Sequence, residues 1–205
     1  MRIDSYPLGQ LQANCYFLTQ GNDCIIIDPG DSADFILEKI QRERLNVIAL
    51  IATHGHFDHI MAVGEIQLSY DIPLYIHDDD LFLVKRLNKT TKHFLGFDPA
   101  AIPPRNTISL GAGALSVGSF EFDIIHTPGH TPGSCSIYVK EENSVLTGDT
   151  LFKQGIGSYD HSYGDKKVLF NSLKTLFALP EETIVYPGHE DITTIGEEKL
   201  ILQLS

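Results

Sequence analysis

The stretch that decides the fold reads Thr53-His54-Gly55-His56-Phe57-Asp58-His59, and an apolar run at residues 47–52 stands directly before it. The apolar run predicts a buried strand, because it is short, continuous and followed by threonine and glycine. The stretch itself places four side chains of two metal-binding kinds, histidine and aspartate, within six residues. Since open α/β sheets bind ligands beyond the carboxyl ends of their strands, this order predicts a metal site at a strand end.

The segments around this strand alternate between strand and helix patterns. Strands are expected at residues 14–18, 24–28 and 74–76, and helices at 33–40, with Ser32 as N-cap, and at 58–69. Residues 78–86 read as helical, with Asp78-Asp79-Asp80 as a solvated N-terminus, and residues 87–105 read as a loop or lid. This alternation predicts an α/β fold.

The second half of the chain begins with strands and ends with helices. Strand patterns occupy residues 108–110, 115–117, 120–125, 134–138, 144–147 and 183–186, and helix patterns occupy 168–177 and 196–204. The order of strands, helices, strands and helices predicts two similar halves stacked as an αββα sandwich. The 205 residues suit one domain with a sizeable core.

Composition narrows the classes of partner. The chain has 15 basic and 27 acidic residues, and its net charge of −12 disfavours binding to nucleic acid or to anionic membranes. The N-terminus lacks an apolar signal core, and no stretch approaches the roughly 18 apolar residues of a membrane span. Cys15, Cys24 and Cys135 are scattered, which indicates reduced thiols in a cytoplasmic protein, with Cys15 and Cys24 on buried strands.

Three further potential ligands, His130, Asp149 and His189, each stand directly after a glycine and beyond a predicted strand. A glycine in that place indicates a tight backbone or an approaching ion that leaves no room for a Cβ atom. The complete set holds five histidines and two aspartates: His54, His56, Asp58, His59, His130, Asp149 and His189. Seven ligands exceed one tetrahedral ion and fit two ions that share a carboxylate, and the set contains no thiolate of a structural zinc site.

Motifs along essentially the whole chain resemble the metallo-β-lactamase superfamily, beginning with Asn14-Cys15-Tyr16 and Asp28-Pro29-Gly30. The resemblance implies an αββα four-layer sandwich with mixed sheets, formed by one domain over residues 1–205. It also implies the ligand assignment. The first metal would be bound by His54, His56 and His130, the second by Asp58, His59 and His189, and both by a bridging Asp149.

Within the superfamily, the chain is most similar to the short, single-domain members of the glyoxalase II-like group. Four motifs carry this similarity: His126-Thr127-Pro128-Gly129-His130-Thr131-Pro132-Gly133-Ser134, Thr147-Gly148-Asp149-Thr150-Leu151-Phe152, Tyr186-Pro187-Gly188-His189 and Thr193-Thr194-Ile195-Gly196-Glu197-Glu198. The resemblance implies a hydrolase that cleaves a hydroxyacylglutathione-like thioester. Two divalent ions, first of all Zn²⁺ with Fe or Mn²⁺ as alternatives, would supply a bridging hydroxide, and Asp58 would orient it.

The sequence departs from the group in two places that concern glutathione. Ser158 stands where related proteins place Arg or Lys, and the C-terminal helical domain of the full-length enzymes is not expected, since only residues 190–205 follow His189. Tyr159, Asp160 and His161 lie near the predicted site and are candidates for substrate binding. A small-molecule thioester is the expected partner, while the acyl group and the oligomeric state stay open.

Other functions remain as alternatives. A glutathione persulfide dioxygenase also resembles glyoxalase II, but it would hold one iron on His54, His130 and Asp149. A β-lactamase is disfavoured by the surroundings of the motifs, a nuclease by the charge, and an oxygen-reducing diiron protein because that family has Glu where His56 stands. A binding protein without activity would require the predicted ligand set to serve no turnover.

Outside the predicted ligand set, His77 and His126 are expected to be structural and His93 to lie on the surface.

Overall fold

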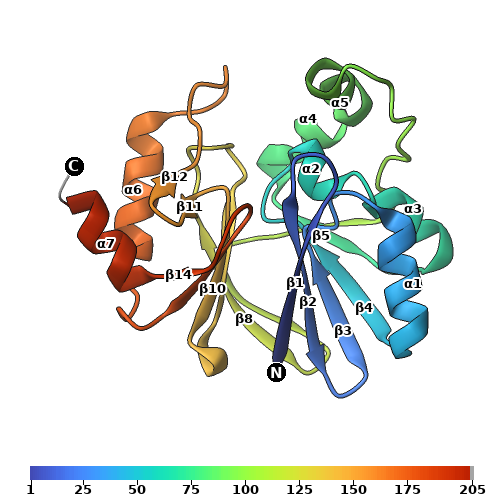
Figure 1. Cartoon of the computed structure of the whole chain (residues 1–205), viewed down its shortest axis with the longest axis horizontal. Coiled ribbons are helices and arrows are strands. Elements are labelled where there is room, and N and C mark those ends of the chain that lie inside the picture. The colour runs from blue at the N-terminus through green and yellow to red at the C-terminus, as the bar shows by residue number, and fades with distance from the viewer. Residues whose placement is uncertain (204–205) are drawn as a thin grey trace.

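Within residues 1–203, which the computed structural model describes, the chain forms two six-stranded sheets that pack face to face with helices outside both (Figure 1). The first sheet has the order β1 (Arg2–Leu8), β2 (Ala13–Gln20), β3 (Asp23–Ile27), β4 (Asn46–Ile51), β5 (Leu74–Ile76) and β6 (Thr107–Ser109). The second has the order β14 (Thr193–Thr194), β13 (Ile184–Pro187), β10 (Ser144–Gly148), β9 (Cys135–Val139), β8 (Phe120–His126) and β7 (Gly113–Val117). The predicted αββα sandwich is confirmed.

Both sheets are mixed, as expected. Strands β1 to β3 pair antiparallel and β3 to β6 pair parallel, while in the second sheet only β10 and β13 are parallel partners. Parallel neighbours need a crossover, and helices lie in all four of the crossovers. These helices are α1 (Ala33–Glu43) between β3 and β4, α2 (Phe57–Ile60) with α3 (Val63–Ser69) between β4 and β5, α4 (Leu81–Val84) with α5 (Leu87–Leu95) between β5 and β6, and α6 (Lys166–Leu176) between β10 and β13.

Strand β2 explains why parts of the sequence read as continuous apolar runs. Its side chains alternate between two cores, because successive residues of a strand point to opposite faces. Cys15 and Phe17 face the core beneath α1 and α3, whereas Tyr16 and Leu18 face the core between the sheets. A strand that is buried on both faces has no polar side to alternate with.

The opposite outer layer forms in the same way. Helix α6 places Leu169, Leu173 and Leu176 on one buried stripe, and Leu173 and Leu176 pack against Val145 and Val185 of the second sheet. Helix α7 (Ile195–Gln203) covers the edge beside it (Figure 1). The helices predicted at residues 168–177 and 196–204 are therefore present as α6 and α7. The expected last residue of the second helix, Leu204, lies outside the described residues.

Several local predictions were wrong. The helix expected at residues 58–69 is divided into α2 and α3. Ser32 stands at the N-cap of α1, but its left-handed conformation gives no hydrogen bond from the side chain to the helix. The segment 78–86 is a 3₁₀ turn, η1 (Asp78–Asp80), followed by the short α4 (Leu81–Val84), and Asp80 is buried instead of solvated.

The expected loop at residues 87–105 begins with a helix, α5 (Leu87–Leu95). Two of its own residues, Leu87 and Thr91, are buried, and its Phe94 stacks on Phe57 of α2 with ring centroids 5.9 Å apart. Packing against α2 thus decides a segment whose own sequence carries a weak helix signal. Three short or edge elements were also not predicted: β1, β14 and the hairpin of β11 (Leu151–Phe152) and β12 (Gly155–Ile156).

Two other predictions concern the cysteines and the membrane. Cys15 on β2 and Cys24 on β3 are buried, as expected, and both are free thiols, as is the buried Cys135. Among the helices of the described residues, none has the length and apolar character needed to cross a membrane.

Candidate metal centre

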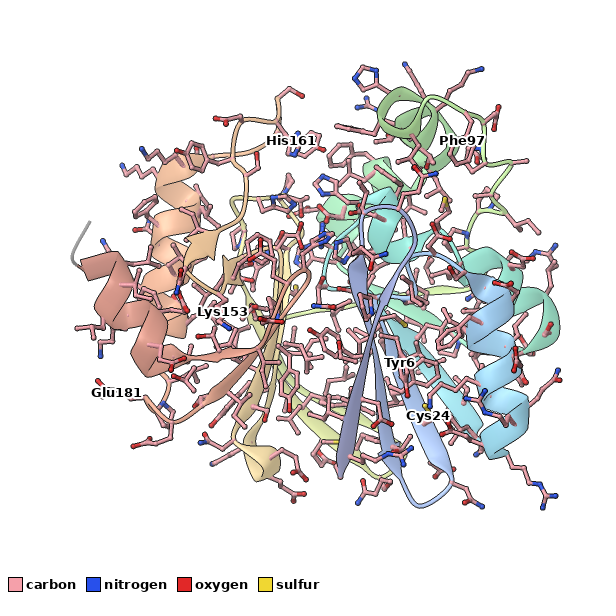
Figure 2. The ribbon with its side chains drawn as sticks, in the orientation of Figure 1. Tyr6, Cys24, Phe97, Lys153, His161 and Glu181 are labelled. Atoms are coloured by element: carbon pink, nitrogen blue, oxygen red, sulfur yellow. The ribbon has the colours of Figure 1, made fainter. Side chains whose placement is uncertain are left out.

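The structure brings all seven predicted ligands together at one edge of the sandwich. His54 and His56 follow β4, Asp58 and His59 lie on α2, and His130 lies between β8 and β9. Asp149 and His189 come directly after β10 and shortly after β13. Figure 2 shows side-chain nitrogen and oxygen atoms gathered between the two halves of the molecule, below the labelled His161. Each sheet therefore contributes ligands to one cluster.

The first group consists of His54, His56, His130 and Asp149. The Nδ1 atom of His56 lies 3.0 Å from Nε2 of His54 and 2.9 Å from Nε2 of His130. Asp149 Oδ2 lies 3.5 Å from the same nitrogen of His130. Ligand atoms at about 2.1 Å around one tetrahedral ion are separated by about 3.4 Å. The group therefore has nearly the spacing of a coordination shell.

Hydrogen bonds at the outer ring nitrogens decide which tautomers face inward. The Nδ1–H of His130 donates to the carbonyl oxygen of Ser158, at 2.7 Å. The Nδ1–H of His54 donates to Thr53 Oγ1, at 3.1 Å, because that hydroxyl itself donates to Asp28. His56 contacts the hydroxyl of Tyr163 through Nε2, at 2.8 Å. Nε2 of His54 and Nε2 of His130 therefore turn their lone pairs toward Nδ1 of His56, an arrangement that suits a cation among the three nitrogens.

The second group consists of Asp58, His59 and His189. Asp58 Oδ2 lies 3.4 Å from Nε2 of His189 and 3.8 Å from Nε2 of His59. Asp149 reaches this group as well, because its Oδ1 lies 3.4 Å from Nε2 of His59. Oδ2 of Asp149, which lies near His130 of the first group, is also 3.7 Å from Nε2 of His189. The Asp149 carboxylate therefore lies between the two groups, which is the position that a bridging ligand would occupy.

Two unsatisfied atoms support a cation in the second group. Among the described side chains, His59 Nε2 and Asp149 Oδ1 are the buried nitrogen and oxygen atoms without a hydrogen-bond partner. Burying such atoms without a partner costs about 1–3 kcal/mol each. His59 and His189 both donate Nδ1–H outward, to Asp28 and to the carbonyl oxygen of Leu11, and so turn lone pairs inward. The residues present fit metal ions in both groups.

The electrostatics of the metal-free site point the same way. Burial, together with the neighbouring imidazoles, holds the pKa of His54 and of His56 well below the usual value. Burial also opposes a charge on His59, but the carboxylates around it, first that of Asp149, outweigh burial and raise the pKa to about 10. Without metal, a proton on His59 balances the carboxylates. With metal, the ions supply that positive charge.

Two glycines next to ligands leave no room for a side chain. A Cβ atom on Gly188 would collide with Asp149 Oδ1, so the glycine before His189 lets the two ligands meet. Gly129, before His130, has φ +130° and lies against the backbone of Leu169 on α6. The expected reason for the repeated glycines therefore holds at both positions. A predicted ligand approaches closely at Gly188, and the backbone of a helix does so at Gly129.

Sequence reasoning missed two carboxylates that support the site. Asp28 accepts the backbone N–H and the hydroxyl of Thr53, both at 2.7 Å, besides the Nδ1–H of His59. Asp80 accepts hydrogen bonds, each at 2.7 Å, from the N–H of Gly55, the hydroxyl of Thr131 and the N–H of Gly133. A signal existed for Asp28, which is the last residue of a predicted strand, at the edge that carries the predicted ligands.

A third cluster forms around the histidines expected to be structural. The rings of His77 and His126 stack at 4.4 Å with planes 5° apart, and Asp79 lies beside them. Parallel rings direct their lone pairs in parallel planes, which do not converge on one ion. His126 donates Nε2–H to the carbonyl oxygen of Pro132, and the Asp79 N–H donates to His77 Nδ1. These bonds fit the expected structural role, and His93 is exposed, as predicted.

A cavity of about 630 Å³ opens beside the two groups. Ser158 and His161 lie on its wall, and His161 also stacks on Tyr163 with ring centroids 5.4 Å apart. Among the described residues that line the cavity, Tyr159 and Asp160 are absent, and the Lys166 Nζ lies over the Tyr159 ring. Of the three candidates for substrate binding, the structure thus brings His161 to the cavity.

Residues 8–189 match the model of the metallo-β-lactamase superfamily. The chain belongs to this superfamily. A member from Bacillus subtilis, named probable metallo-hydrolase YqgX, is 38% identical over 201 residues, which cover 97% of this chain and 95% of the relative. Another, hydroxyacylglutathione hydrolase GloC of Haemophilus influenzae, is 33% identical over 202 residues, with 97% and 95% covered.

Solved structures of superfamily members share the whole architecture. The B3 metallo-β-lactamase BLEG-1 has a TM-score of 0.90 at 36% identity, with 96% of each chain covered. The protein TTHA1623, solved in a di-iron-bound form, has a TM-score of 0.88 at 38% identity and the same coverage. ETHE1 from Myxococcus xanthus has a TM-score of 0.78 at 27% identity, covering 97% of this chain and 82% of its own.

Proposed function

We propose that this protein is a dinuclear metallohydrolase of the glyoxalase II-like group and that it cleaves thioesters. One observation carries the proposal: five histidines and Asp58 converge in two groups that Asp149 joins. When bound, two divalent cations lower the pKa of water and polarise a carbonyl group, which makes a hydrolytic nucleophile available at neutral pH. The similarity to GloC supports a thioester as the substrate.

The assigned roles follow the two groups. His54, His56 and His130 would bind one ion, while Asp58, His59 and His189 would bind the other, and Asp149 would bind both. Asp58 also lies on the cavity wall, where its carboxylate can accept a hydrogen bond from the attacking water and orient it. A thiolate is a good leaving group, so this reaction places little demand on a general acid.

Zn²⁺ is the metal we propose first, with Fe or Mn²⁺ as alternatives, because imidazole and carboxylate ligands accept all three. We also propose that residues 1–205 act as one domain on a small-molecule substrate in the cytoplasm. The free thiols of Cys15, Cys24 and Cys135 support a reducing compartment.

A glutathione persulfide dioxygenase is the second candidate, favoured by the similarity to ETHE1. It would use one iron on His54, His130 and Asp149. The Nε2 of His59 and the Oδ1 of Asp149, which have no hydrogen-bond partner, favour two ions instead, since one iron in the first group would leave the Nε2 of His59 without a metal to bind.

Reaction assays with metal analysis separate the two candidates. We expect protein purified without added metal to hold two ions per chain and to hydrolyse a panel of thioesters that includes S-lactoylglutathione. His56→Ala should lose metal and hydrolysis, whereas His93→Ala, at an exposed position outside the ligand set, should retain both. One iron per chain, with oxygen uptake on glutathione persulfide and no thioester hydrolysis, would overturn the proposal.

A further inference from the structure

The wall of the cavity beyond the predicted ligands combines an apolar surface with a few polar groups. Leu11, Phe57, Phe94 and Phe152 supply the apolar surface. The polar groups are the carboxylate of Glu190, the imidazole of His161 and the uncharged side chains of Gln12, Thr90 and Ser158. Among the described residues that line the cavity, none is Lys or Arg. This wall has to accept the part of the substrate that is not held at the metal groups.

Helix α5 presents an apolar face to the cavity. Thr90 and Phe94 line it together, since residues four apart lie on one side of a helix. Phe94 is 57% exposed, although it stacks on Phe57, so most of its ring is left for a ligand. Lys89 and Lys92 lie roughly 140° and 160° around the helix axis from Phe94, at 3.6 residues per turn. The positive charges of α5 therefore face away from the cavity.

The opposite wall places apolar groups next to the second metal group. The ring of Phe152 lies 6.2 Å from the ring of His189, centroid to centroid. The carbonyl oxygen of Leu11 accepts the Nδ1–H of His189, and the Leu11 side chain is 43% exposed. A thiol leaving from a carbonyl at the metal groups would thus lie between Phe94, Leu11 and Phe152.

Cations in the segments that border the cavity have other contacts. Lys153 pairs with Asp191 at 3.2 Å, and Lys166 lies over the ring of Tyr159. Arg86 lies over the ring of Phe82, at 5.5 Å. A ligand carboxylate against this wall would lose water without gaining a charged partner, at a cost of about 1–3 kcal/mol or more.

We infer that the substrate is a thioester of an uncharged thiol with apolar groups, and that glutathione, with its two carboxylates, is a poor thiol portion for this site. The inference rests on the proposed thioester hydrolysis and names the substrate class of that same site. Leu11, Phe94 and Phe152 would contact the thiol portion, while the acyl group lies at the metal groups.

A pair of substrates that differ in whether the two glutathione carboxylates are free or esterified tests the inference. The metal-loaded protein would be assayed with S-lactoylglutathione and with its diethyl ester, in which both carboxylates are masked. We expect kcat/KM to be about tenfold or more higher for the diester, because 1.4 kcal/mol corresponds to a factor of ten. Ser158→Arg should raise the ratio of kcat/KM for the free acid to kcat/KM for the diester, because the guanidinium would give a ligand carboxylate a charged partner.

A second variant tests the apolar wall. Phe94→Ala should lower kcat/KM for the diester mainly through KM, whereas Phe170→Ala, at an exposed phenylalanine of α6 outside the cavity lining, should not. Ready hydrolysis with equal or higher kcat/KM for the free acid would overturn the inference and leave the proposed function intact. Hydrolysis of neither compound by protein loaded with two metals would contradict the proposed function, and the inference with it.

Discussion

Each inward-facing histidine of the candidate metal centre is oriented by an oxygen at its other ring nitrogen. The oxygens belong to a carboxylate, two backbone carbonyls and two hydroxyls: Asp28, Leu11, Ser158, Thr53 and Tyr163. Such partners hold the ring in place and raise the basicity of the ligating nitrogen. Metal binding by these histidines would therefore depend on residues that are not themselves predicted ligands.

Asp28→Asn tests this dependence at one residue. The amide is a weaker acceptor for the Nδ1–H of His59 and removes a charge beside the second metal group. We expect metal affinity to fall about 10- to 100-fold, as for other groups that support metal ligands. Competition of a chelator for bound Zn²⁺ measures the change. Asp23→Asn, at a surface position that contacts Asn46, is the matched control and should leave the affinity unchanged.

The seven predicted ligands, which the structure brings together, could be picked out from the sequence because their signal is local. Each is a histidine or aspartate that follows a strand pattern, and Gly129, Gly148 and Gly188 mark three of the turns. The role of Asp80 could not be identified in this way. It depends on contacts with Thr131 and Gly133, which lie 51 and 53 residues further along the chain. An Asp-Asp-Asp run at the start of a helix predicts solvated side chains. Asp80 is buried because the loop that carries Thr131 and Gly133 packs over it.

Among the elements of the fold, loops that follow strands carry most of the candidate metal centre, and hydrogen bonds between these loops fix their relative positions. Asp80, at the end of η1, joins the loop after β4 to the loop between β8 and β9. Gly129 lets the second of these loops lie against the backbone of α6. Ligands from distant parts of the chain thus converge because their loops are attached to one another as well as to the sheets.

Asp80→Ala should break the attachment between the two ligand loops. It leaves two buried N–H groups and a buried hydroxyl without their acceptor, and each charge-assisted bond contributes about 1.5–3 kcal/mol. We expect the free energy of unfolding of the metal-free protein to fall by about 3 kcal/mol in urea titration. Asp79→Ala, whose side chain is 61% exposed, should change it little. Equal stability of the two variants would contradict the role assigned to Asp80.

Gly129→Ala should be destabilising for a different reason. Its φ of +130° is strained for a residue with a side chain, and the new Cβ atom would meet the backbone of Leu169. We expect a loss of about 2 kcal/mol or more in thermal or urea unfolding. Gly111→Ala is the control, because nothing lies within 4 Å of a Cβ atom built there and its φ is not in the left-handed region. A neutral Gly129→Ala would show that the loop can move away from α6.

Helix α5 shows the limit of sequence reasoning at this scale. Its sequence, Leu87–Leu95, combines threonine and lysine with a few apolar residues, and this pattern predicts a loop. It is helical because Leu87 and Thr91 are buried against neighbouring elements and because Phe94 stacks on Phe57. The strands β2 and β3 are easier to predict. Both of their faces are buried, so each strand appears in the sequence as a continuous apolar run, whatever it packs against.

At the scale of the whole molecule, the candidate centre joins the two sheets. The first sheet supplies His54 and His56 through the loop after β4, and the second supplies His130, Asp149 and His189. Bound metal would therefore cross-link two halves that otherwise meet through the apolar core between the sheets. Stability and metal binding should be coupled, because ions that bind only the folded state stabilise it.

Metal removal tests this coupling. Dialysis against a chelator should lower the midpoint of thermal unfolding, and the addition of Zn²⁺ should restore it. An ion at 100 times its Kd adds about 2.7 kcal/mol, which corresponds to several degrees for a domain of this size. Differential scanning calorimetry measures the midpoint. The His56→Ala variant should show a smaller response to Zn²⁺, and an identical response would contradict the assignment of the first group.

A titration of the metal-free protein with Zn²⁺ tests whether two ions are needed for thioester hydrolysis, which is followed at each added equivalent. We predict that activity reaches its plateau at two equivalents per chain. Full activity at one equivalent, or hydrolysis that does not depend on added metal, would contradict a two-metal centre that hydrolyses thioesters.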